Sequence, residues 1–196
     1  MLKRSFDIIS SLFGLIIIFP FLFIIAVLVL LESKGGIFYF QTRVGKNNLD
    51  FKLYKIRTMY KDADKRGLLT VGTRDKRITR VGYYLRKYKL DEFPQLLNIL
   101  FGDMSFVGPR PEVRKYVDLY TQEQMKVLTV KPGLTDFASL KYYNENEILS
   151  KFEDAEKGYI EFVMPDKIKL NMEYIQRKSF MLDIKIIFQT LFKWMK

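Results

Sequence analysis

The sequence predicts an α-rich α+β protein, in which an N-terminal re-entrant membrane helix, a small β-hairpin and interfacial amphipathic helices surround one compact domain. Three observations predict this fold class. Leu12–Leu31 is an uncharged apolar run, two apolar segments flank the turn-like Gly45–Asn48, and Phe180–Lys196 sorts into an apolar face and a lysine-rich face. We therefore divide the chain into residues 1–34, a membrane hairpin, and residues 35–196, a membrane-associated domain of ordinary size.

The apolar run is long enough to reach across a bilayer. At ~1.5 Å per residue, a helix over Leu12–Leu31 just covers the ~30 Å hydrocarbon core. Pro20 interrupts the run near its middle. Because proline has no N–H and its ring clashes with the preceding turn, we expect a kink there. Proline is tolerated in spanning helices, so a kinked span and a hairpin that re-enters the same leaflet both fit this segment.

The flanking charges favour the hairpin. Lys3 and Arg4 precede the run, and Lys34, Arg43 and Lys46 are the first basic residues after it. Because basic flanks stay on the cytoplasmic side of a membrane, both ends of the segment are expected there. A straight span cannot place both ends on one side, whereas a hairpin that breaks at the central proline can.

The next elements follow from alternation and from helix signals. Residues 37–57 predict a β-hairpin, and the polar, glycine-punctuated residues 58–82 predict a short helix followed by a loop. A helix is expected from Asp91 to Leu100, with Pro94 in its first turn and Gly102 at its end. Further along, we expect a loop over 103–111, a helix over Glu112–Val130 stopped by Pro132-Gly133, and mostly helix over 144–177.

The end of the chain predicts an amphipathic helix over Phe180–Lys196. At about 100° per residue, Gln189 and the lysines lie on one side and apolar residues on the other, with Leu182 and Ile186 as exceptions. An aromatic-rich apolar face opposite lysines is typical of a helix at a membrane interface. A core helix packed on the domain fits the same pattern. The apolar face comprises Phe180, Met181, Ile184, Ile187, Phe188, Leu191, Phe192, Trp194 and Met195.

The composition excludes several kinds of chemistry. The 196 residues include no histidine and no cysteine, which rules out Ser-His-Asp triads, cysteine nucleophiles, thiolate metal clusters and disulfides. Carboxylates, basic side chains, hydroxyls and a hard metal ion held by oxygen ligands remain. The 33 Lys+Arg against 22 Asp+Glu give a net charge of +11, which predicts anionic lipids or anionic substrates as partners. No signature of a nucleic-acid-binding fold is present, so nucleic acid is not expected.

Two adjacent carboxylates, Asp91 and Glu92, are the strongest chemical candidates. They stand at a predicted helix start, directly after a basic cluster that includes Arg86 and Lys89. Exposed N–H groups at a helix start bind phosphate and stabilise a carboxylate as an anion, which then serves as a nucleophile toward phosphorus. Such a site needs cations or Mg²⁺ to offset the repulsion between carboxylate and phosphate. An ordinary N-terminal cap explains the same dipeptide.

Two further motifs are weaker. Arg110 lies between two prolines, which stiffen the backbone and hold the guanidinium ready for a bidentate phosphate contact, although a rigid connector with a solvated arginine fits as well. Asp62 and Asp64 have the DxD form with which many glycosyltransferases hold a metal–nucleotide-sugar. They lie in a run of alternating charges, where a solvated, salt-bridged helix is the simpler interpretation.

Taken together, these segments resemble the bacterial sugar transferases, the small monotopic phosphoglycosyl transferases. The resemblance covers essentially the whole chain, and the order of its central motifs is highly specific. The matching elements are a basic start, an apolar segment with a central proline, Lys55-Ile56-Arg57-Thr58-Met59, Leu90-Asp91-Glu92-Phe93-Pro94-Gln95, Gly102-Asp103-Met104-Ser105-Phe106-Val107-Gly108-Pro109-Arg110-Pro111, Lys131-Pro132-Gly133-Leu134-Thr135 and Ser179-Phe180-Met181-Leu182-Asp183.

The resemblance implies transfer of a sugar 1-phosphate from a UDP-sugar to a polyprenyl phosphate such as undecaprenyl phosphate, with release of UMP. It implies Mg²⁺ and a two-step route through an aspartyl-phosphosugar intermediate at the cytoplasmic face of the bacterial inner membrane, among its lipids, and it allows a homodimer. By position, Asp91 is the implied nucleophile and metal ligand, Glu92 its partner and Pro20 the break of a re-entrant helix. The implied phosphate or nucleotide contacts are Lys55, Arg57, Arg86, Arg110 and Pro111.

Three departures from the family pattern bear on selectivity. Phe19 precedes the central proline where many members have serine, and Leu170-Asn171 replaces a Leu/Tyr-Asp pair. Residues 136–145 replace a stretch that in many members carries an arginine. Two other functions stay open from the sequence, a non-catalytic scaffold at the membrane surface and a metal-dependent glycosyltransferase that uses Asp62 and Asp64.

Overall fold

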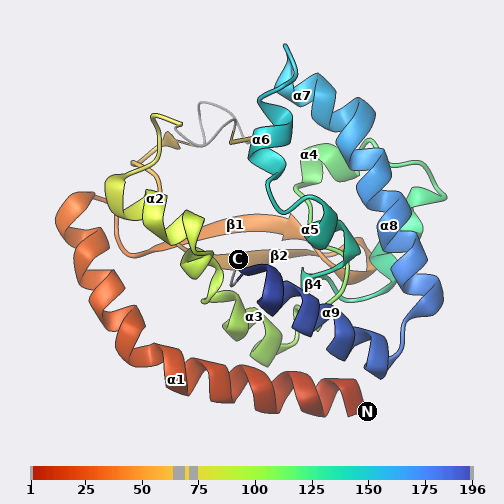
Figure 1. The fold of residues 1–196 in the computed structure, drawn as a ribbon, viewed down its shortest axis with the longest axis horizontal. Helices are drawn as coiled ribbons and strands as arrows, with labels where there is room; N and C mark the ends of the chain where they lie inside the picture. The colour runs from red at the N-terminus through yellow and green to blue at the C-terminus, as the bar shows by residue number, and fades with distance from the viewer. Residues whose placement is uncertain (1, 64–68, 71–74, 195–196) are drawn as a thin grey trace.

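The computed structural model describes residues 2–63, 69–70 and 75–194 (Figure 1). Short helices and two small sheets form a body that rests on one long N-terminal helix. The helices are α1 (Leu2–Glu32), α2 (Arg80–Lys87), α3 (Gln95–Phe101), α4 (Arg114–Val117), α5 (Phe137–Lys141), α6 (Glu145–Leu149), α7 (Ala155–Gly158), α8 (Met164–Arg177) and α9 (Phe180–Trp194). Shorter helical turns are η1 (Lys46–Asn48), η3 (Leu90–Glu92), η4 (Gln124–Thr129) and the π-helical η5 (Tyr159–Val163); the strands are β1 (Phe38–Val44), β2 (Asp50–Ile56), β3 (Ser105–Val107) and β4 (Gly133–Thr135).

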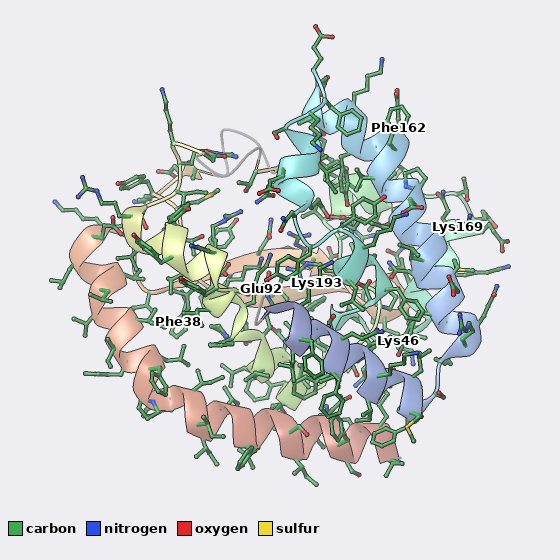
Figure 2. The ribbon with its side chains drawn as sticks, in the orientation of Figure 1. Phe38, Lys46, Glu92, Phe162, Lys169 and Lys193 are labelled. Carbon is green, nitrogen blue, oxygen red and sulfur yellow. The ribbon has the colours of Figure 1, made fainter. Side chains whose placement is uncertain are left out.

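The long helix α1 is apolar and largely uncovered. It is long and apolar enough to cross a membrane, and most of its apolar side chains are exposed on the side away from the body (Figure 2). Pro20 lies inside it, and the helix bends about midway along its length (Figure 1). The missing N–H and the ring of a proline are the usual cause of such a bend. The predicted kink is thus present within one continuous helix.

Both ends of α1 are fastened to the same body. Near its start, the buried Asp7 carboxylate accepts a hydrogen bond from the backbone N–H of Phe106 at 3.2 Å. At its end, Glu32 accepts hydrogen bonds from the backbone N–H groups of Arg80 and Val81 at 2.6 and 2.7 Å. These two N–H groups open α2 and have no partner within that helix. The bent helix therefore spans the underside of the body and holds it at two points.

The predicted β-hairpin is confirmed. β1 and β2 pair antiparallel from Phe38 opposite Ile56 to Val44 opposite Asp50. Asn47, in the connecting turn, adopts a left-handed backbone conformation with φ 57°, which asparagine tolerates better than most residues. A second, parallel pair joins the three-residue strands β3 and β4; the sequence did not indicate it.

The helix that follows the acidic pair begins later than predicted. Pro94 is its N-cap, not a residue of its first turn, and Asp91 lies in the separate 3-10 turn η3. Gly102 ends α3 in a left-handed conformation with φ 99°, as expected. Because α3 starts at Gln95, Asp91 is neither its cap nor a residue of its first turn. The N-terminus of α3 therefore does not offset the charge of a phosphate at Asp91, and side chains or a metal ion would have to do so.

The prediction of a single helix over Glu112–Val130 is wrong. The chain instead forms the four-residue α4 and then the 3-10 turn η4. The Thr121 N–H donates to the Gln124 side chain at 2.9 Å, and the Gln124 N–H donates to the Thr121 hydroxyl at 3.3 Å. This reciprocal pairing is a capping box, which starts a new helical turn and so ends the preceding one.

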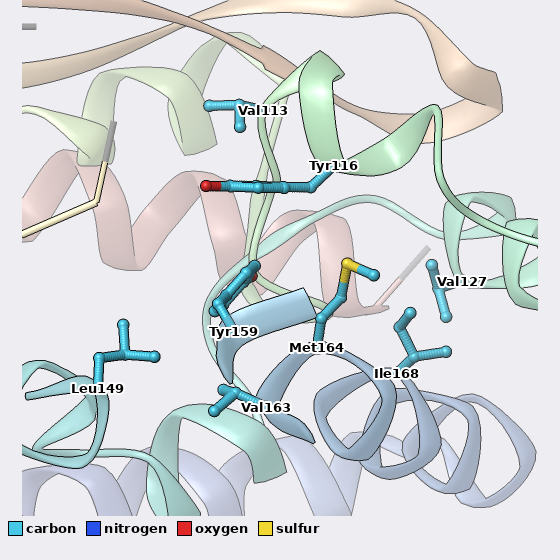
Figure 3. Close-up of a cluster of buried hydrophobic side chains, with 8 residues drawn as sticks. All are labelled: Val113, Tyr116, Val127, Leu149, Tyr159, Val163, Met164 and Ile168. Atoms are coloured by element: carbon cyan, nitrogen blue, oxygen red, sulfur yellow. The ribbon is translucent and has the colours of Figure 1, made fainter. Parts of the chain in front are cut away.

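The region over 144–177 is mostly helical, as predicted, and builds the largest buried cluster. α4, η4 and the α6–α8 region contribute eight buried side chains that pack together (Figure 3). Tyr116 and Tyr159 are its largest members, with ring centroids 4.9 Å apart. The cluster comprises Val113, Tyr116, Val127, Leu149, Tyr159, Val163, Met164 and Ile168.

The C-terminal helix α9 combines the two predicted settings. Ile186 and Leu182, the exceptions to its apolar face, pack against Val107 and Tyr174 in the core. Lys3 of α1 pairs with the buried Asp183 of α9 at 2.8 Å. A second apolar row stays exposed, which suits an interfacial helix anchored on the domain. That row comprises Met181, Phe188, Leu191 and Phe192.

Candidate active site

The acidic pair lies at a sharp change of chain direction. Lys89 follows α2 in a left-handed conformation with φ 53° and leads directly into η3. This turn carries Asp91 inward, where only 6% of the residue is exposed. Glu92 is also largely covered, with 14% of its side chain exposed, and lies near the centre of the molecule (Figure 2). Two adjacent carboxylates are thus both withdrawn from water.

Glu92 is the anion with which two basic side chains of the site pair. Arg110 donates a charged hydrogen bond from Nη2 to the Glu92 carboxylate. Lys55 places its Nζ 3.5 Å from the same oxygen. The three side chains come from η3, from the end of β2 and from the loop after β3. Glu92 therefore fixes two cations beside Asp91.

The Arg110 loop is held by a close approach of two backbones. Gly108 and Gly133 lie so near each other that a Cβ on Gly133 would be 2.1 Å from the Gly108 nitrogen. No side chain fits there, so this approach requires glycine. The Arg110 N–H also donates to the Asp136 carboxylate at 3.1 Å. These two contacts fix the loop and thereby the position of the Arg110 guanidinium.

The strand that carries Lys55 is tied to the helix that follows the acidic pair. The buried Asn98 of α3 accepts a hydrogen bond from the Tyr54 N–H at 3.0 Å and donates one to the Lys52 carbonyl at 2.8 Å. One side chain thus satisfies two backbone groups on the open edge of β2. Because α3 directly follows the acidic pair, this contact fixes Lys55 relative to Asp91 and Glu92.

The two carboxyl groups have opposite electrostatics. Burial raises the pKa of Asp91, and the neighbouring Glu92 charge raises it further, against the opposing effect of Lys55. Burial also acts to raise the pKa of Glu92, but Arg110 and Lys55 outweigh it, and the pKa falls well below its usual range. Burial lowers the pKa of Lys55, opposed by the Glu92 charge. Neighbouring titratable groups with diverging environments are a recurring feature of active sites.

Asp91 is free for chemistry. Within the described part of the chain, its carboxylate accepts no hydrogen bond and makes no salt bridge, although it is buried. Buried carboxylates are normally paired, so an unpaired one beside fixed cations is a functional candidate. Asp91 thus has no partner at salt-bridge distance among the described residues, whereas Glu92 is paired with Arg110 and Lys55.

The other predicted site residues divide into two groups. Arg86 is held near the pair by a hydrogen bond to the Thr70 hydroxyl at 2.8 Å, and burial lowers its pKa against the attraction of Asp91. Pro111 follows Arg110, and its carbonyl accepts a hydrogen bond from Arg43 at 3.0 Å. Arg57 instead donates to the carbonyls at the start of β1, and none of its described contacts reaches the acidic pair.

The described residues give no support to the alternative function, a glycosyltransferase that holds its metal with Asp62 and Asp64. Asp62 has a left-handed backbone with φ 62°, not the helical conformation expected for a salt-bridged helix. Asp64 lies outside the described residues. Among residues 2–63, 69–70 and 75–194, no group of three or more acidic side chains is arranged to hold a metal ion.

Sequence reasoning missed a second group of charged side chains beside Arg110. Arg43 donates to the Glu112 carboxylate at 3.1 Å, and Lys167 pairs with Glu145 at 2.9 Å. Tyr159 joins the two pairs, since its hydroxyl donates to Glu112 and accepts from Lys167. The position of Glu112, next to the Gly-Pro-Arg-Pro motif, was the one available signal. The other residues come from distant segments with no common spacing.

Comparison with known proteins identifies the family. The model of the bacterial sugar transferase family matches residues 1–196. The chain belongs to the bacterial sugar transferase family. A UDP-N-acetylgalactosamine-undecaprenyl-phosphate N-acetylgalactosaminephosphotransferase from Aeromonas hydrophila is 36% identical over 97% of this chain and 43% of its own length. A UDP-glucose:undecaprenyl-phosphate glucose-1-phosphate transferase from Escherichia coli K12 is 36% identical over 98% of this chain and 40% of its own length.

The relatives of this chain differ in size. The chain spans less than half the length of the Aeromonas and Escherichia proteins. It matches 93% of the exopolysaccharide production protein PSS from Rhizobium leguminosarum, at 36% identity over 97% of this chain. The family predicted from the sequence motifs is thus confirmed.

Proposed function

We propose that this sugar transferase moves a sugar 1-phosphate from a UDP-sugar to a polyprenyl phosphate such as undecaprenyl phosphate, releases UMP, and so begins a lipid-linked glycan. The observation that carries the proposal is the acidic pair, in which Asp91 is buried and unpaired while Glu92 fixes Lys55 and Arg110 beside it. Relatives named for transfer of a sugar phosphate to undecaprenyl phosphate support the substrate class.

The proposed reaction has two balanced steps. First, an Asp91 carboxylate oxygen attacks the sugar-bearing phosphorus of the UDP-sugar; an Asp–O–P bond forms and the bond from this phosphorus to UMP breaks. Second, an oxygen of the polyprenyl phosphate attacks the same phosphorus and Asp91 leaves as a carboxylate. The product is a polyprenyl diphosphate sugar. Both steps transfer a phosphoryl group, for which positioning and charge neutralisation supply most of the rate.

The fixed cations fit that requirement. Lys55 and Arg110 are already held by Glu92, so little order is lost when a diphosphate binds against them. Glu92 acts here through the two cations and need not touch the substrate. Arg86, on the Asp91 side, adds a third cation. Burial and the Glu92 charge raise the pKa of Asp91, so its carboxylate is more basic than that of an ordinary aspartate.

Mg²⁺ fits this site as a partner of the substrate. Mg²⁺ commonly takes one or two carboxylates and completes its shell with water and substrate phosphates, so a three-carboxylate cluster is not needed. Asp91 is the free carboxylate of the pair and would hold the ion with one oxygen. When bound, Mg²⁺ neutralises phosphate charge and polarises the phosphorus–oxygen bonds.

The membrane arrangement supports a lipid acceptor. α1 is exposed and apolar, bends midway, and is fastened to one body at both ends, as expected of a helix that enters and leaves the same leaflet at Pro20. The exposed apolar row on α9 lies on a helix that contacts α1. The basic residues that flank α1 on both sides support a domain at the cytoplasmic face of the inner membrane.

The experiment measures which nucleotide is released. Purified protein with undecaprenyl phosphate, Mg²⁺ and a panel of UDP-sugars should release UMP, and the Asp91→Asn variant should release none while remaining folded and membrane-bound. Release of UDP would instead indicate a glycosyltransferase, and no nucleotide release by the wild type would leave the membrane scaffold as the better account. UMP release at near wild-type rate by Asp91→Asn would remove Asp91 as the nucleophile.

A further inference from the structure

A polar cavity adjoins the acidic pair on the far side of Arg110. It has a volume of about 140 Å³ and opens between the Arg110–Pro111 segment and α6. Val113, Tyr116, Leu149 and Tyr159 of the buried cluster form its base and lie together on one side of that cluster (Figure 3). The proposed two-step reaction uses none of these side chains.

The cavity wall carries an alternating set of charges. Arg43 pairs with Glu112, and Lys167 pairs with Glu145; all four side chains line the cavity. Between 14% and 28% of each side chain is exposed. Tyr159 links the two pairs through its hydroxyl. Paired charges in such a setting supply both hydrogen-bond donors and acceptors without a net charge.

One polar side chain in this wall has no partner. Asn146 lines the cavity and is half-buried, and within the described residues its side chain forms no hydrogen bond. Its amide therefore offers one acceptor and two donor hydrogens that no other described side chain uses to whatever molecule enters the cavity. Asn146 directly follows the stretch over 136–145 in which this chain departs from its family.

We infer that this cavity binds the sugar ring of the UDP-sugar and selects which sugar is transferred; the inference rests on the proposed function. Arg110 joins the cavity to the acidic pair, because it lines the former and pairs with Glu92 of the latter. A diphosphate held between Arg110 and Asp91 would therefore present its sugar to the cavity. Arg43 and Lys167 are already paired with Glu112 and Glu145, so the wall offers hydrogen bonds with little uncompensated charge, which suits a neutral group.

The lining fits a sugar better than uracil. A sugar ring carries several hydroxyl groups, each of which both donates and accepts, and the wall offers carboxylates to receive them and cations and an amide to donate. Uracil has a single ring N–H donor, which would leave one of the two carboxylates without a partner from the ligand. Unpaired polar groups of this kind are costly, and for the same reason they discriminate between similar ligands.

The test compares Asn146→Ala with Asn144→Ala. Asn144 lies two residues away and is exposed, and its side chain donates to Glu147 at 3.2 Å; neither residue lines the cavity. For each variant, kcat/KM is measured with a panel of UDP-sugars, together with product inhibition by UMP, which lacks a sugar. We expect Asn146→Ala to lower kcat/KM for the preferred UDP-sugar by about tenfold, to change the preference among sugars, and to leave inhibition by UMP unchanged. Asn144→Ala should behave as the wild type.

A second pair of variants tests the charged wall. Glu145→Gln removes one carboxylate from the cavity. As the control, Asp166→Asn breaks the neighbouring salt bridge between Lys141 of α5 and Asp166 of α8, neither of which lines the cavity. A loss of sugar preference in Glu145→Gln alone supports the inference. An equal effect of both variants indicates that α8 has merely loosened, and overturns it.

The remaining outcomes separate this inference from the proposed function. Weaker inhibition by UMP in Asn146→Ala, with sugar preference intact, would make the cavity a nucleoside site and overturn the inference. Unchanged kinetics in both Asn146→Ala and Glu145→Gln would also overturn it. Both results require a wild type that releases UMP from at least one UDP-sugar. If it releases none, the proposed function itself has failed.

Discussion

Neutralising the two adjacent carboxylates one at a time should change the stability of the folded protein in opposite directions. Glu92→Gln removes the anion that Lys55 and Arg110 share, whereas Asp91→Asn removes a buried charge that pairs with no cation at salt-bridge distance in the described structure. We expect the first variant to be less stable than the wild type at neutral pH, and the second to be more stable.

The Glu92 effect can be worked from the contact distances. At 3.5 Å and an effective dielectric constant of about 20, the attraction between Lys55 and Glu92 is about 5 kcal/mol. Part of it offsets the cost of burying both charges, and removing one partner of such a pair typically costs 3–5 kcal/mol. Arg110 is 34% exposed, so water screens it and we add little for its contact. Glu92→Gln should thus cost about 3 kcal/mol, or a fall of about 6–12 °C in melting temperature.

The Asp91 effect follows from the direction of its pKa. Burial and the Glu92 charge raise the pKa of Asp91 above its unfolded value, so its ionised form disfavours the folded state at neutral pH. Asparagine has no charge to bury, and relief of such functional strain commonly gains about 1 kcal/mol. The gain should vanish as the pH falls and the wild-type Asp91 becomes protonated. Glu92 has the reverse dependence, because its lowered pKa contributes stability above the unfolded pKa that is lost in acid.

The assay is thermal unfolding of the detergent-solubilised protein, followed by circular dichroism at neutral pH and again in acid. Glu123→Gln serves as control, since its pair with Lys126 is exposed and should contribute less than about 0.5 kcal/mol. Equal shifts of the same sign in Asp91→Asn and Glu92→Gln would refute the reasoning. So would a stability gain in Asp91→Asn that persists unchanged in acid.

Two further predictions concern the metal and the membrane helix. Chelation of divalent ions by EDTA should stop UMP release and addition of Mg²⁺ should restore it, because Lys55, Arg86 and Arg110 do not balance the two carboxylates and the diphosphate together; full activity without divalent ions would remove the metal from the scheme. Asp7→Ala should cost about 2 kcal/mol in a denaturant titration, because the Phe106 N–H and the Ser105 hydroxyl lose their acceptor, each at 3.2 Å; an unchanged midpoint would contradict this.

Local signals predicted the elements that depend on nearby residues. The hairpin followed from alternation around a Gly–Asn turn, and Gly102 correctly marked the end of α3. The helix over Glu112–Val130 was wrong although the signal that breaks it is local, since Thr121 and Gln124 have capping-box spacing. The pairing of β3 with β4 was beyond sequence reasoning, because each strand has three residues and they lie far apart in the chain.

The sequence identified the charged residues of the site, and the family resemblance implied different roles for Asp91 and Glu92. The contacts that distinguish the two carboxylates are visible only in the structure, where Arg110 and Lys55 pair with Glu92. The resemblance implied a phosphate or nucleotide contact for Arg57 as for Lys55, yet the Arg57 side chain donates to the Gly36 carbonyl just before β1. The cavity inferred to bind the sugar had no common sequence signature, because its charged side chains come from four separate segments of the chain.

The membrane helix helps to set the geometry of the site itself. One end of α1 holds β3, whose following loop carries Arg110, and the other end holds the start of α2, which carries Arg86. Arg110 and Arg86 therefore belong to segments that are fastened to opposite ends of one helix. Because the bend in α1 determines how far apart those ends lie, the kink at Pro20 bears on the spacing of the cations as well as on the path through the membrane.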